Sequence, residues 1–338
     1  MLSHSNLIVN AIQMRRCMPA LEEGQERFMG ALPFFHVHGM TVTMGVGIYL
    51  GAELILLPSP RPIDGVMKAI ARRKATIFPG VPTMYVGIVN HPDVSRYDLR
   101  SVKACISGAA SLPLEVQERF GELTGGRLVE GYGLTEASPV THCNPLYGER
   151  RAGSIGLPLP DVEAKIMDYD TLVEQPVGEA GELWVRGPQV MRGYWNRPDE
   201  TAVTITQDGW LRTGDIARMD EDGYFYIIDR LKDVIIASGL KVVPREVEEV
   251  LYEHPKVQEA VVAGVPDPYR GETVKAYIVL RASESATPEE IEAFCSDKLA
   301  SPKLPRQIEF RSELPRTAVG KLLRRALIEE EQQKLGRS

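Results

Sequence analysis

Short apolar runs alternate with helical patterns over the first 130 residues, and this alternation restricts the fold more than any other feature of the chain. The expected strands are 28–34, 52–57, 75–78 and 102–106. The expected helices between them are 62–73, 81–90 and 113–124. Apolar runs this short, with helices between them, are typical of buried strands. Strands that alternate with helices predict a parallel sheet with helices packed on it.

The pattern changes twice further along the 338 residues. After residue 150, glycine and proline become frequent and strands such as VEAKIM and GELWVRG are separated by turns, which predicts a β-rich region. After DRLKD (229–233), helices and strands alternate in an α+β pattern. We therefore predict an α/β fold with two domains. The large domain is expected at 1–229, with β/α layers at 1–149 and a β-rich subdomain at 150–229. A small α+β domain is expected at 230–338, with the boundary near 229–234.

Composition and charge exclude several classes of protein. With 43% hydrophobic and 25% charged residues, the chain resembles ordinary water-soluble globular proteins. Its net charge is −7, but residues 303–325 hold seven basic side chains against Glu309 and Glu313. On an acidic protein, such a stretch suits a small phosphorylated ligand better than a nucleic-acid duplex. The alternative is a solvated basic helix. We therefore expect no nucleic-acid partner.

Cysteine usage and the apolar segments indicate the compartment. The four cysteines lie far apart without a C-x-x-C pair, and no two of the six histidines are spaced i,i+4. These spacings argue against a disulfide framework or a zinc site and favour a reducing cytoplasm. The start lacks the pattern of a signal peptide. The most apolar stretch, 39–57, contains Thr41, Thr43 and Glu53 and is too interrupted for a membrane span.

The segment EGYGLTE (130–136) combines an aromatic ring, glycines, a hydroxyl and a carboxylate. It follows the apolar run RLVEG, so it is expected at the carboxyl end of a strand, where ligands bind on parallel sheets. A nucleotide needs a flat surface for its base, a donor for a phosphate and an anion for Mg²⁺. The segment SGAASLP (107–113) also follows a strand, and its small residues let the backbone approach a flat base.

Seven such motifs occur in order, and together they resemble the adenylate-forming acyl-CoA synthetases, a superfamily that also contains luciferases and peptide-synthetase adenylation domains. The motifs are 33–39, 107–113, 130–136, 181–195, 209–217, 229–248 and 315–321. The resemblance covers essentially the whole chain and implies an acid–thiol ligase. Such an enzyme uses ATP, Mg²⁺ and coenzyme A to join a carboxylate to AMP and then to a thiol. This chemistry depends on positioning and cations, and needs no protein nucleophile.

The resemblance implies a nucleotide site in the large domain. Tyr132, between Gly131 and Gly133, would stack on adenine, Thr135 would contact phosphate, and Glu136 would hold Mg²⁺. The residues expected to line adenine are Gly108, Ala109 and Ala110. Asp215 would accept both ribose hydroxyls and Arg230 would contact ribose or phosphate, although a structural salt bridge is the alternative for these two residues.

The acyl group is expected near two other motifs. His36 of PFFHVHG would lie near the reacting carboxylate, with a purely structural histidine as the alternative, while His38 has no assigned role. Val81 and Tyr85 would line the acyl tunnel, with Tyr85 as a gate, unless both belong to the core. The segment 208–233 is similar to that of fatty-acyl-CoA synthetases. The segments 153–168 and 81–92 are most similar to bacterial long-chain fatty acid–CoA ligases. A medium-chain or aryl acid is the alternative substrate.

The small domain would supply the remaining groups. Lys321 corresponds to the family's adenylation lysine, whose ammonium reaches the carboxylate and the α-phosphate. Lys232 corresponds to a hinge about which this domain rotates between the half-reactions. Ser238 and Gly239 would then approach the pantetheine tunnel, unless they form only a rigid turn.

One family motif is absent: no TSGTTGxPKG phosphate loop precedes these segments, and MLSHSNL is its usual continuation. We therefore expect the chain to lack the loop that cradles the β- and γ-phosphates, and to use ATP poorly by itself. The alternative is an inactive or binding-only fragment that retains a pocket for AMP or coenzyme A. A homodimer and peripheral association with a membrane are both compatible with the sequence.

Overall fold

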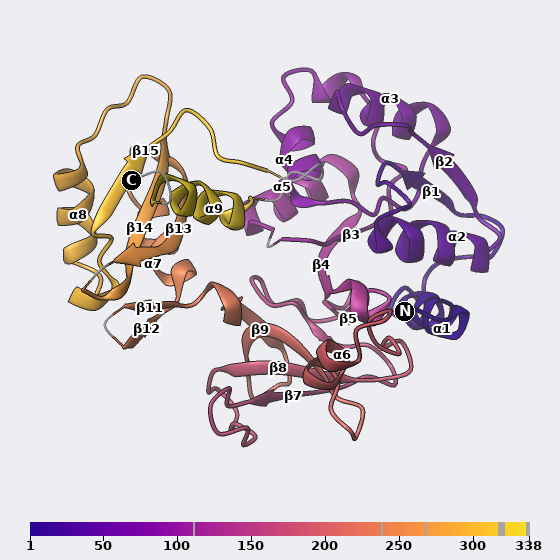
Figure 1. Ribbon diagram of the computed structural model, residues 1–338. Helices are drawn as coiled ribbons and strands as arrows, with labels where there is room; N and C mark the ends of the chain where they lie inside the picture. The colour runs from indigo at the N-terminus through magenta and orange to yellow at the C-terminus, as the bar shows by residue number, and fades with distance from the viewer. Residues whose placement is uncertain (111, 238, 268, 317–321, 336–338) are drawn as a thin grey trace. The chain divides into compact units, whose positions relative to one another are not determined.

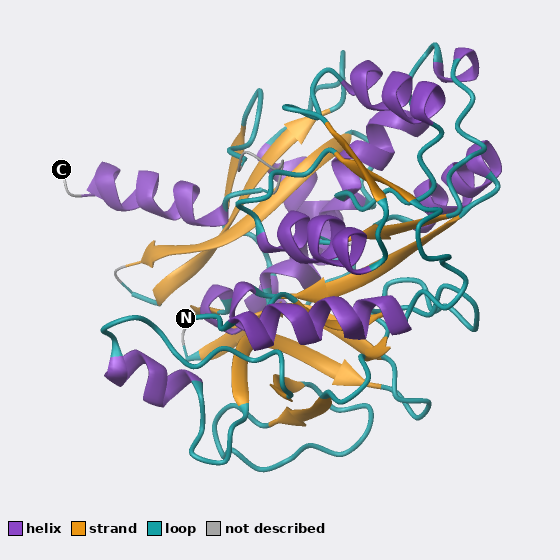
Figure 2. Ribbon diagram, turned by 90° about the vertical axis from the view of Figure 1, so that its right-hand side faces the viewer, coloured by secondary structure: helices purple, strands orange, loops and turns teal. Residues whose placement is uncertain are grey.

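The computed structural model describes residues 1–338 except 111, 238, 268, 317–321 and 336–338 (Figure 1). The chain divides into two compact units. The first unit comprises Met1–Thr213 and Ala217–Ile227, and the second comprises Gly214–Ile216 and Ile228–Ser338. Helices and strands alternate along both units (Figure 2), so the mixed α/β fold expected from the sequence is confirmed. No helix within the described ranges is long and apolar enough to cross a membrane.

The first unit contains the predicted parallel arrangement. Its strands are β1 (Arg27–Gly30), β2 (Glu53–Leu56), β3 (Ala104–Ser107) and β4 (Arg127–Gly133). β1 pairs with β2, and β3 pairs with β4, each in parallel. Parallel bridges from Ile77 to Phe28 and to Ala104 join the two pairs through the segment around Ile77. The sheet therefore runs β2, β1, Ile77, β3, β4, with every carboxyl end at the same edge.

Helices cover both faces of this sheet. They are α1 (His4–Arg16), η1 (Gly39–Gly45, a π-helix), α2 (Val46–Tyr49), α3 (Ile63–Arg73), α4 (Pro82–Val89), η2 (Val94–Arg96, one 3₁₀ turn) and α5 (Leu114–Thr124). Alternate residues of a strand point to opposite faces. Accordingly, Met29 and Phe78 pack in the core formed with α3, α4 and α5. Phe28 and Ile77 pack in the core formed with α1, η1 and α2.

A β-rich region begins where β4 turns into antiparallel pairing, and its last two strands include Gly214–Ile216 and Ile228–Arg230 of the second unit. Its elements are η3 (Thr135–Ala137), β5 (Val140–Cys143), β6 (Leu157–Pro158), β7 (Glu163–Met167), β8 (Gly181–Arg186), α6 (Pro198–Thr204), β9 (Leu211–Met219) and β10 (Phe225–Arg230). β5 lies between β4 and β6, and a second sheet has the order β10-β9-β8-β7. Figure 1 shows β7, β8 and β9 of this second sheet. Leu183, Leu211 and Phe225 form its core.

The second unit is built on a long antiparallel hairpin. Its elements are η4 (Leu231–Asp233), β11 (Ile235–Ala237), β12 (Leu240–Val242), α7 (Pro244–Tyr252), β13 (Val257–Asp267), β14 (Gly271–Leu280), α8 (Pro288–Ser296), η5 (Ser301–Lys303), β15 (Gln307–Phe310) and α9 (Arg324–Leu335). β13 and β14 form the hairpin, and β15 adds in parallel to β14. α7 and α8 cover one face through Val247 and Ile291. α9 covers the other through Leu327, which packs near Tyr277.

The basic stretch at 303–325 is paired with acids throughout its described residues. The ion pairs are Lys303–Glu246, Arg306–Glu292, Arg311–Glu330, Arg316–Glu259, Arg324–Glu248 and Arg325–Glu329. These contacts hold the strands and helices of the second unit together. They weaken the interpretation of the stretch as a phosphate-binding surface, because its charges already have partners.

Candidate active site

Four loops that carry predicted site residues leave the same edge of the parallel sheet. They follow β1, the Ile77 segment, β3 and β4, and a parallel bridge from Gly80 to Ser107 keeps the second and third loops adjacent. Their predicted residues are His36, Val81, Gly108, Ala109, Ala110, Gly131, Tyr132, Gly133, Thr135 and Glu136. Carboxyl ends of parallel strands are the usual place for ligands in such folds.

The turn from Gly133 to Pro139 is fixed by close backbone contacts. A Cβ on Gly133 would lie 2.1 Å from the Pro139 carbonyl oxygen, so no larger residue fits there. The Leu134 N–H donates to that same oxygen at 3.0 Å. Thr41 of the π-helix donates its hydroxyl to the Ser138 carbonyl at 2.6 Å. The π-helix therefore connects the loop after β1 to the turn after β4.

Glu136 is held at two points within this turn. Its carbonyl oxygen accepts the Met191 N–H at 2.7 Å, and its Oε1 accepts the Tyr194 hydroxyl at 2.8 Å. Among the residues that the structure describes, neither its Oε2 nor the hydroxyl of exposed Thr135 has a hydrogen-bond partner. One carboxylate oxygen and one hydroxyl are thus left for a ligand.

This donor set fits a hard cation that is bound mainly by phosphate and water. Across the described ranges, no group of three His, Cys, Asp or Glu side chains could form a complete protein cage for a metal. Mg²⁺ at phosphate-binding sites typically takes only one or two protein carboxylates. The Glu136 carboxylate therefore meets the chemical requirement for Mg²⁺ beside a nucleotide.

Tyr194 was not singled out by sequence reasoning. It lies on the segment between β8 and α6, inside the ordered motif 181–195, which was its only signal. Burial and the hydrogen bond to Glu136 raise the pKa of Tyr194 to about 12. The phenol is therefore protonated at neutral pH and acts as a donor to Glu136.

The loop after β3 is shaped by a histidine. A Cβ on Gly108 would lie 2.9 Å from both Cε1 and Nδ1 of His38, so the imidazole occupies the space directly over this glycine. Ala109 has a positive φ of 74° and, like Ala110, is exposed. Glu130 Oε1 accepts the Leu112 N–H at 2.7 Å, which ties this loop to β4.

His36 and His38 differ in their surroundings. His36 is exposed, whereas the Nε2 atom of His38 is buried without a hydrogen-bond partner in the described part of the chain. Burial and the nearby charge of His36 lower the pKa of His38 to about 4, so His38 is neutral at pH 7. Sequence reasoning missed His38 because its role depends on Gly108, which lies 70 positions away.

Val81 and Tyr85 lie in the core beneath the same edge. Val81 is the N-cap residue of α4, and Tyr85 has no exposed surface. The Tyr85 hydroxyl donates to the Phe78 carbonyl at 2.8 Å, and Gly80 leaves room for it. Tyr85 therefore has a structural function in this state, and its assignment to an acyl tunnel stays a prediction.

The predicted residues of the second unit lie on β9, on β10 and on the elements after them. Arg230 Nε lies 3.1 Å from Oδ1 of buried Asp215, so these two residues form an ion pair with each other. Lys232 is exposed in η4, and Gly239 has a φ of +78° in the turn between β11 and β12. Ser238 and Lys321 lie outside the described residues. The roles predicted for all six stay predictions.

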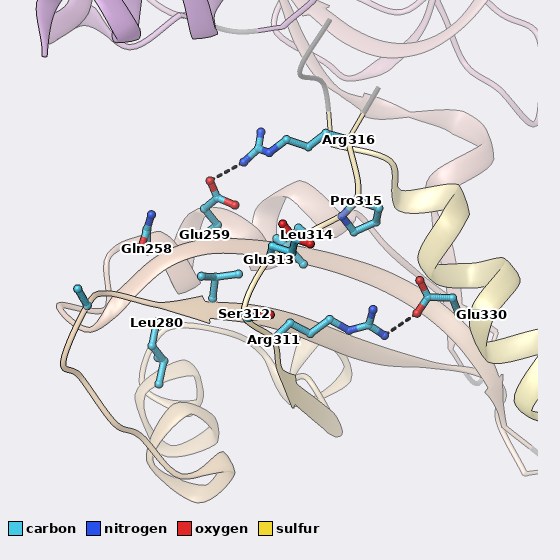
Figure 3. A pocket seen from close by; sticks show the side chains of 12 residues that line it. Gln258, Glu259, Leu280, Arg311, Ser312, Glu313, Leu314, Pro315, Arg316 and Glu330 are labelled. Atoms are coloured by element: carbon cyan, nitrogen blue, oxygen red, sulfur yellow. Dashed lines mark hydrogen bonds and ion pairs between the residues drawn. The ribbon is translucent and has the colours of Figure 1, made fainter. Parts of the chain in front are cut away.

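The second unit also contains an open groove of about 690 Å³ between the ends of β13 and β14 and the segment before Lys321 (Figure 3). Its two arginines point at acids: Arg316 contacts Glu259, and Arg311 lies 2.7 Å from Glu330. No predicted site residue lines it. Its charges stabilise the unit and give no indication of a ligand.

Comparisons with known proteins agree with the motifs. The family model for "AMP-binding enzyme" matches residues 1–195, and the model for "AMP-binding enzyme C-terminal domain" matches residues 246–321. A long-chain-fatty-acid–CoA ligase of Bacillus subtilis (strain 168) is 54% identical over 98% of this chain and 59% of its own length. The chain thus spans about three fifths of that relative.

Solved structures agree on the fold. The structure of the ATP-bound RpMatB-BxBclM chimera B3 superposes with a TM-score of 0.92 at 33% identity, and the match covers 99% of this chain and 65% of that one. The anthranilate CoA ligase AuaEII in complex with anthranoyl-AMP gives a TM-score of 0.83 at 32% identity, with coverage of 99% and 65%.

Proposed function

The chain belongs to the family of AMP-binding enzymes, and we propose on this basis that the whole protein is a long-chain fatty acid–CoA ligase. In the proposed reaction, a carboxylate oxygen attacks the α-phosphorus of ATP and pyrophosphate leaves. The thiol of coenzyme A then attacks the acyl carbon and AMP leaves. The use of Mg²⁺ and a cytoplasmic location belong to the same proposal.

The observation that carries this proposal is the turn at Thr135 and Glu136. Among the described residues, the Thr135 hydroxyl and one carboxylate oxygen of Glu136 have no hydrogen-bond partner. Both groups lie at the carboxyl edge of the parallel sheet, which also bears the Gly108 loop. Thr135 would donate to a phosphate oxygen. Mg²⁺, when bound by Glu136, would supply positive charge to offset the phosphates. Asp215 would bind the ribose hydroxyls after exchanging its contact with Arg230.

Lys321 completes the proposed chemistry as the ammonium that stabilises charge at the α-phosphate. Lys232 would be the pivot of the second unit, and Ser238 with Gly239 would approach pantetheine. These assignments rest on the motifs of the sequence, to which the family membership lends support.

The identity of the carboxylic acid substrate is the most specific part of the proposal. The 54% identity to the Bacillus subtilis long-chain ligase favours a fatty acid. The similarity to the anthranilate ligase structure favours an aryl acid, which is the second candidate. The test is thioester formation by the full-length protein with C8, C12 and C16 fatty acids, benzoate and anthranilate. The proposal expects kcat/KM to be highest for C16, and a preference for benzoate or anthranilate would overturn it.

A further inference from the structure

We propose that Tyr194 is a positioning residue that orients the Glu136 carboxylate toward a divalent cation while leaving its full negative charge available. This inference rests on the proposed function, because it assumes that Glu136 binds the cation that accompanies ATP. It concerns a residue that lies 58 positions from Glu136 and comes from a different segment of the first unit.

The first argument is the geometry of the contact. The Tyr194 hydroxyl donates to Oε1 of Glu136 at 2.8 Å, and it also interacts with the side chain of Thr204. The Met191 N–H fixes the Glu136 backbone at 2.7 Å. Backbone and carboxylate are thus each held by a donor from the segment that follows β8. With Oε1 engaged, Oε2 is the oxygen left for a cation.

The second argument is that Tyr194 is itself held in place. Its N–H donates to the Thr201 hydroxyl at 2.9 Å, and Thr201 also donates to the Arg197 carbonyl at 2.9 Å. A Cβ on Gly193 would lie 2.5 Å from Thr201 Cγ2, so the chain passes close to α6 at this point. The phenol is therefore presented by a constrained backbone.

The third argument is that the hydrogen-bond partner of the Glu136 carboxylate, the Tyr194 phenol, is neutral. No ion pair in the described part of the chain involves Glu136. A lysine or arginine at this distance would neutralise the carboxylate and compete with a cation for it. A phenol orients the carboxylate without cancelling its charge. Groups that hydrogen-bond a metal-binding carboxylate commonly fix its direction in this way.

The test measures metal binding directly. Mn²⁺ affinity in the presence of ATP is measured by water-proton relaxation on the full-length protein, for the wild type and Tyr194→Phe. Loss of such a supporting contact typically weakens metal affinity by about tenfold or more, and we expect about tenfold here. Tyr226→Phe is the matched control, because Tyr226 donates to a carboxylate of the same unit, Asp220, at 3.0 Å. It should bind Mn²⁺ like the wild type.

A double-mutant cycle separates positioning from a general structural effect. If Tyr194 acts through Glu136, Tyr194→Phe has no further effect on Mn²⁺ affinity in a Glu136→Gln background. If Tyr194→Phe does not fold, Thr201→Val is measured instead, because it keeps the Tyr194 phenol and loosens the backbone that holds it. We expect this variant to lose less Mn²⁺ affinity, about threefold.

The outcomes distinguish the two proposals. Equal Mn²⁺ affinity for the wild type and Tyr194→Phe, or an undiminished effect of Tyr194→Phe without Glu136, would overturn the positioning role and leave the proposed function intact. A wild-type protein that binds ATP but no Mn²⁺ with it would overturn both.

Discussion

At Gly108, a methyl group has no room because the His38 ring lies where a Cβ would be placed. Both Cε1 and Nδ1 of His38 would lie 2.9 Å from that Cβ, whereas the next obstacle, the Gly131 carbonyl oxygen, lies at an ordinary 3.8 Å. The sequence predicted a small residue here for the approach of a base. The structure adds that the glycine also accommodates an imidazole of the first unit.

We predict that Gly108→Ala destabilises the first unit by about 1–3 kcal/mol, the usual cost of overpacking. The cost should largely disappear in a His38→Ala background, since the obstacle is then absent. The free energy of unfolding is measured by urea titration. Gly65→Ala in α3 is the control, because beyond its chain neighbours and the backbone of its own helix no atom lies within 4 Å of its added Cβ. A penalty that is unchanged without His38 would contradict this contact.

Among the elements, α9 depends on one arginine at its start. Arg324 lies 2.7 Å from Asp233, 2.8 Å from Glu248 and 3.4 Å from Asp229, and its side chain is only 17% exposed. It thereby ties α9 to η4, α7 and the end of β10 within the second unit. The next residue, Arg325, pairs with Glu329 and is 85% exposed.

Arg324→Gln should destabilise the second unit by about 3 kcal/mol or more, because it leaves one buried and two half-buried carboxylates without this cation. Arg325→Gln should change stability by about 0.5 kcal/mol or less, as is usual for exposed pairs. Hydrogen exchange at the amides of β13 and β14 measures this difference. Similar protection in the two variants would show that the Arg324 contacts contribute little.

Local patterns predicted most elements, whereas contacts between distant segments were not predictable. The helix expected at 113–124 is found at Leu114–Thr124, because its apolar face repeats along the sequence. The π-helix Gly39–Gly45 was predicted only as a segment of an interrupted apolar stretch, since its pairing with Ser138 is invisible locally. The contact between Tyr194 and Glu136 was missed for the same reason.

For the protein as a whole, buried His142 and half-buried His38 contribute to the response to acid. Burial lowers the pKa of His142 from 6.5 to about 3, and His38 titrates with a pKa of about 4. Between pH 6.5 and about pH 4 the unfolded chain takes up protons at these two positions and the folded chain does not. The unfolded state then binds more protons, so stability falls as the pH falls.

We predict that the first unit loses up to about 1.4 kcal/mol of stability per pH unit for each of these histidines below about pH 6. His142→Gln should remove about half of this change in the free energy of unfolding with pH. All three tryptophans, Trp184, Trp195 and Trp210, lie in the first unit, so tryptophan fluorescence during urea unfolding reports on it alone. A flat stability between pH 6.5 and pH 5, or an unchanged slope in His142→Gln, would contradict the assignment.

Glu136 is the residue on which the proposed adenylate-forming reaction depends most. ATP–pyrophosphate exchange that requires a long-chain fatty acid tests its role, measured with the full-length protein and with Glu136→Gln. We predict exchange only when the fatty acid is present, and a loss of about a hundredfold or more in Glu136→Gln, where the charge that holds the cation is removed. Exchange that needs no acid, or that is unchanged in Glu136→Gln, would contradict the proposed function of this site.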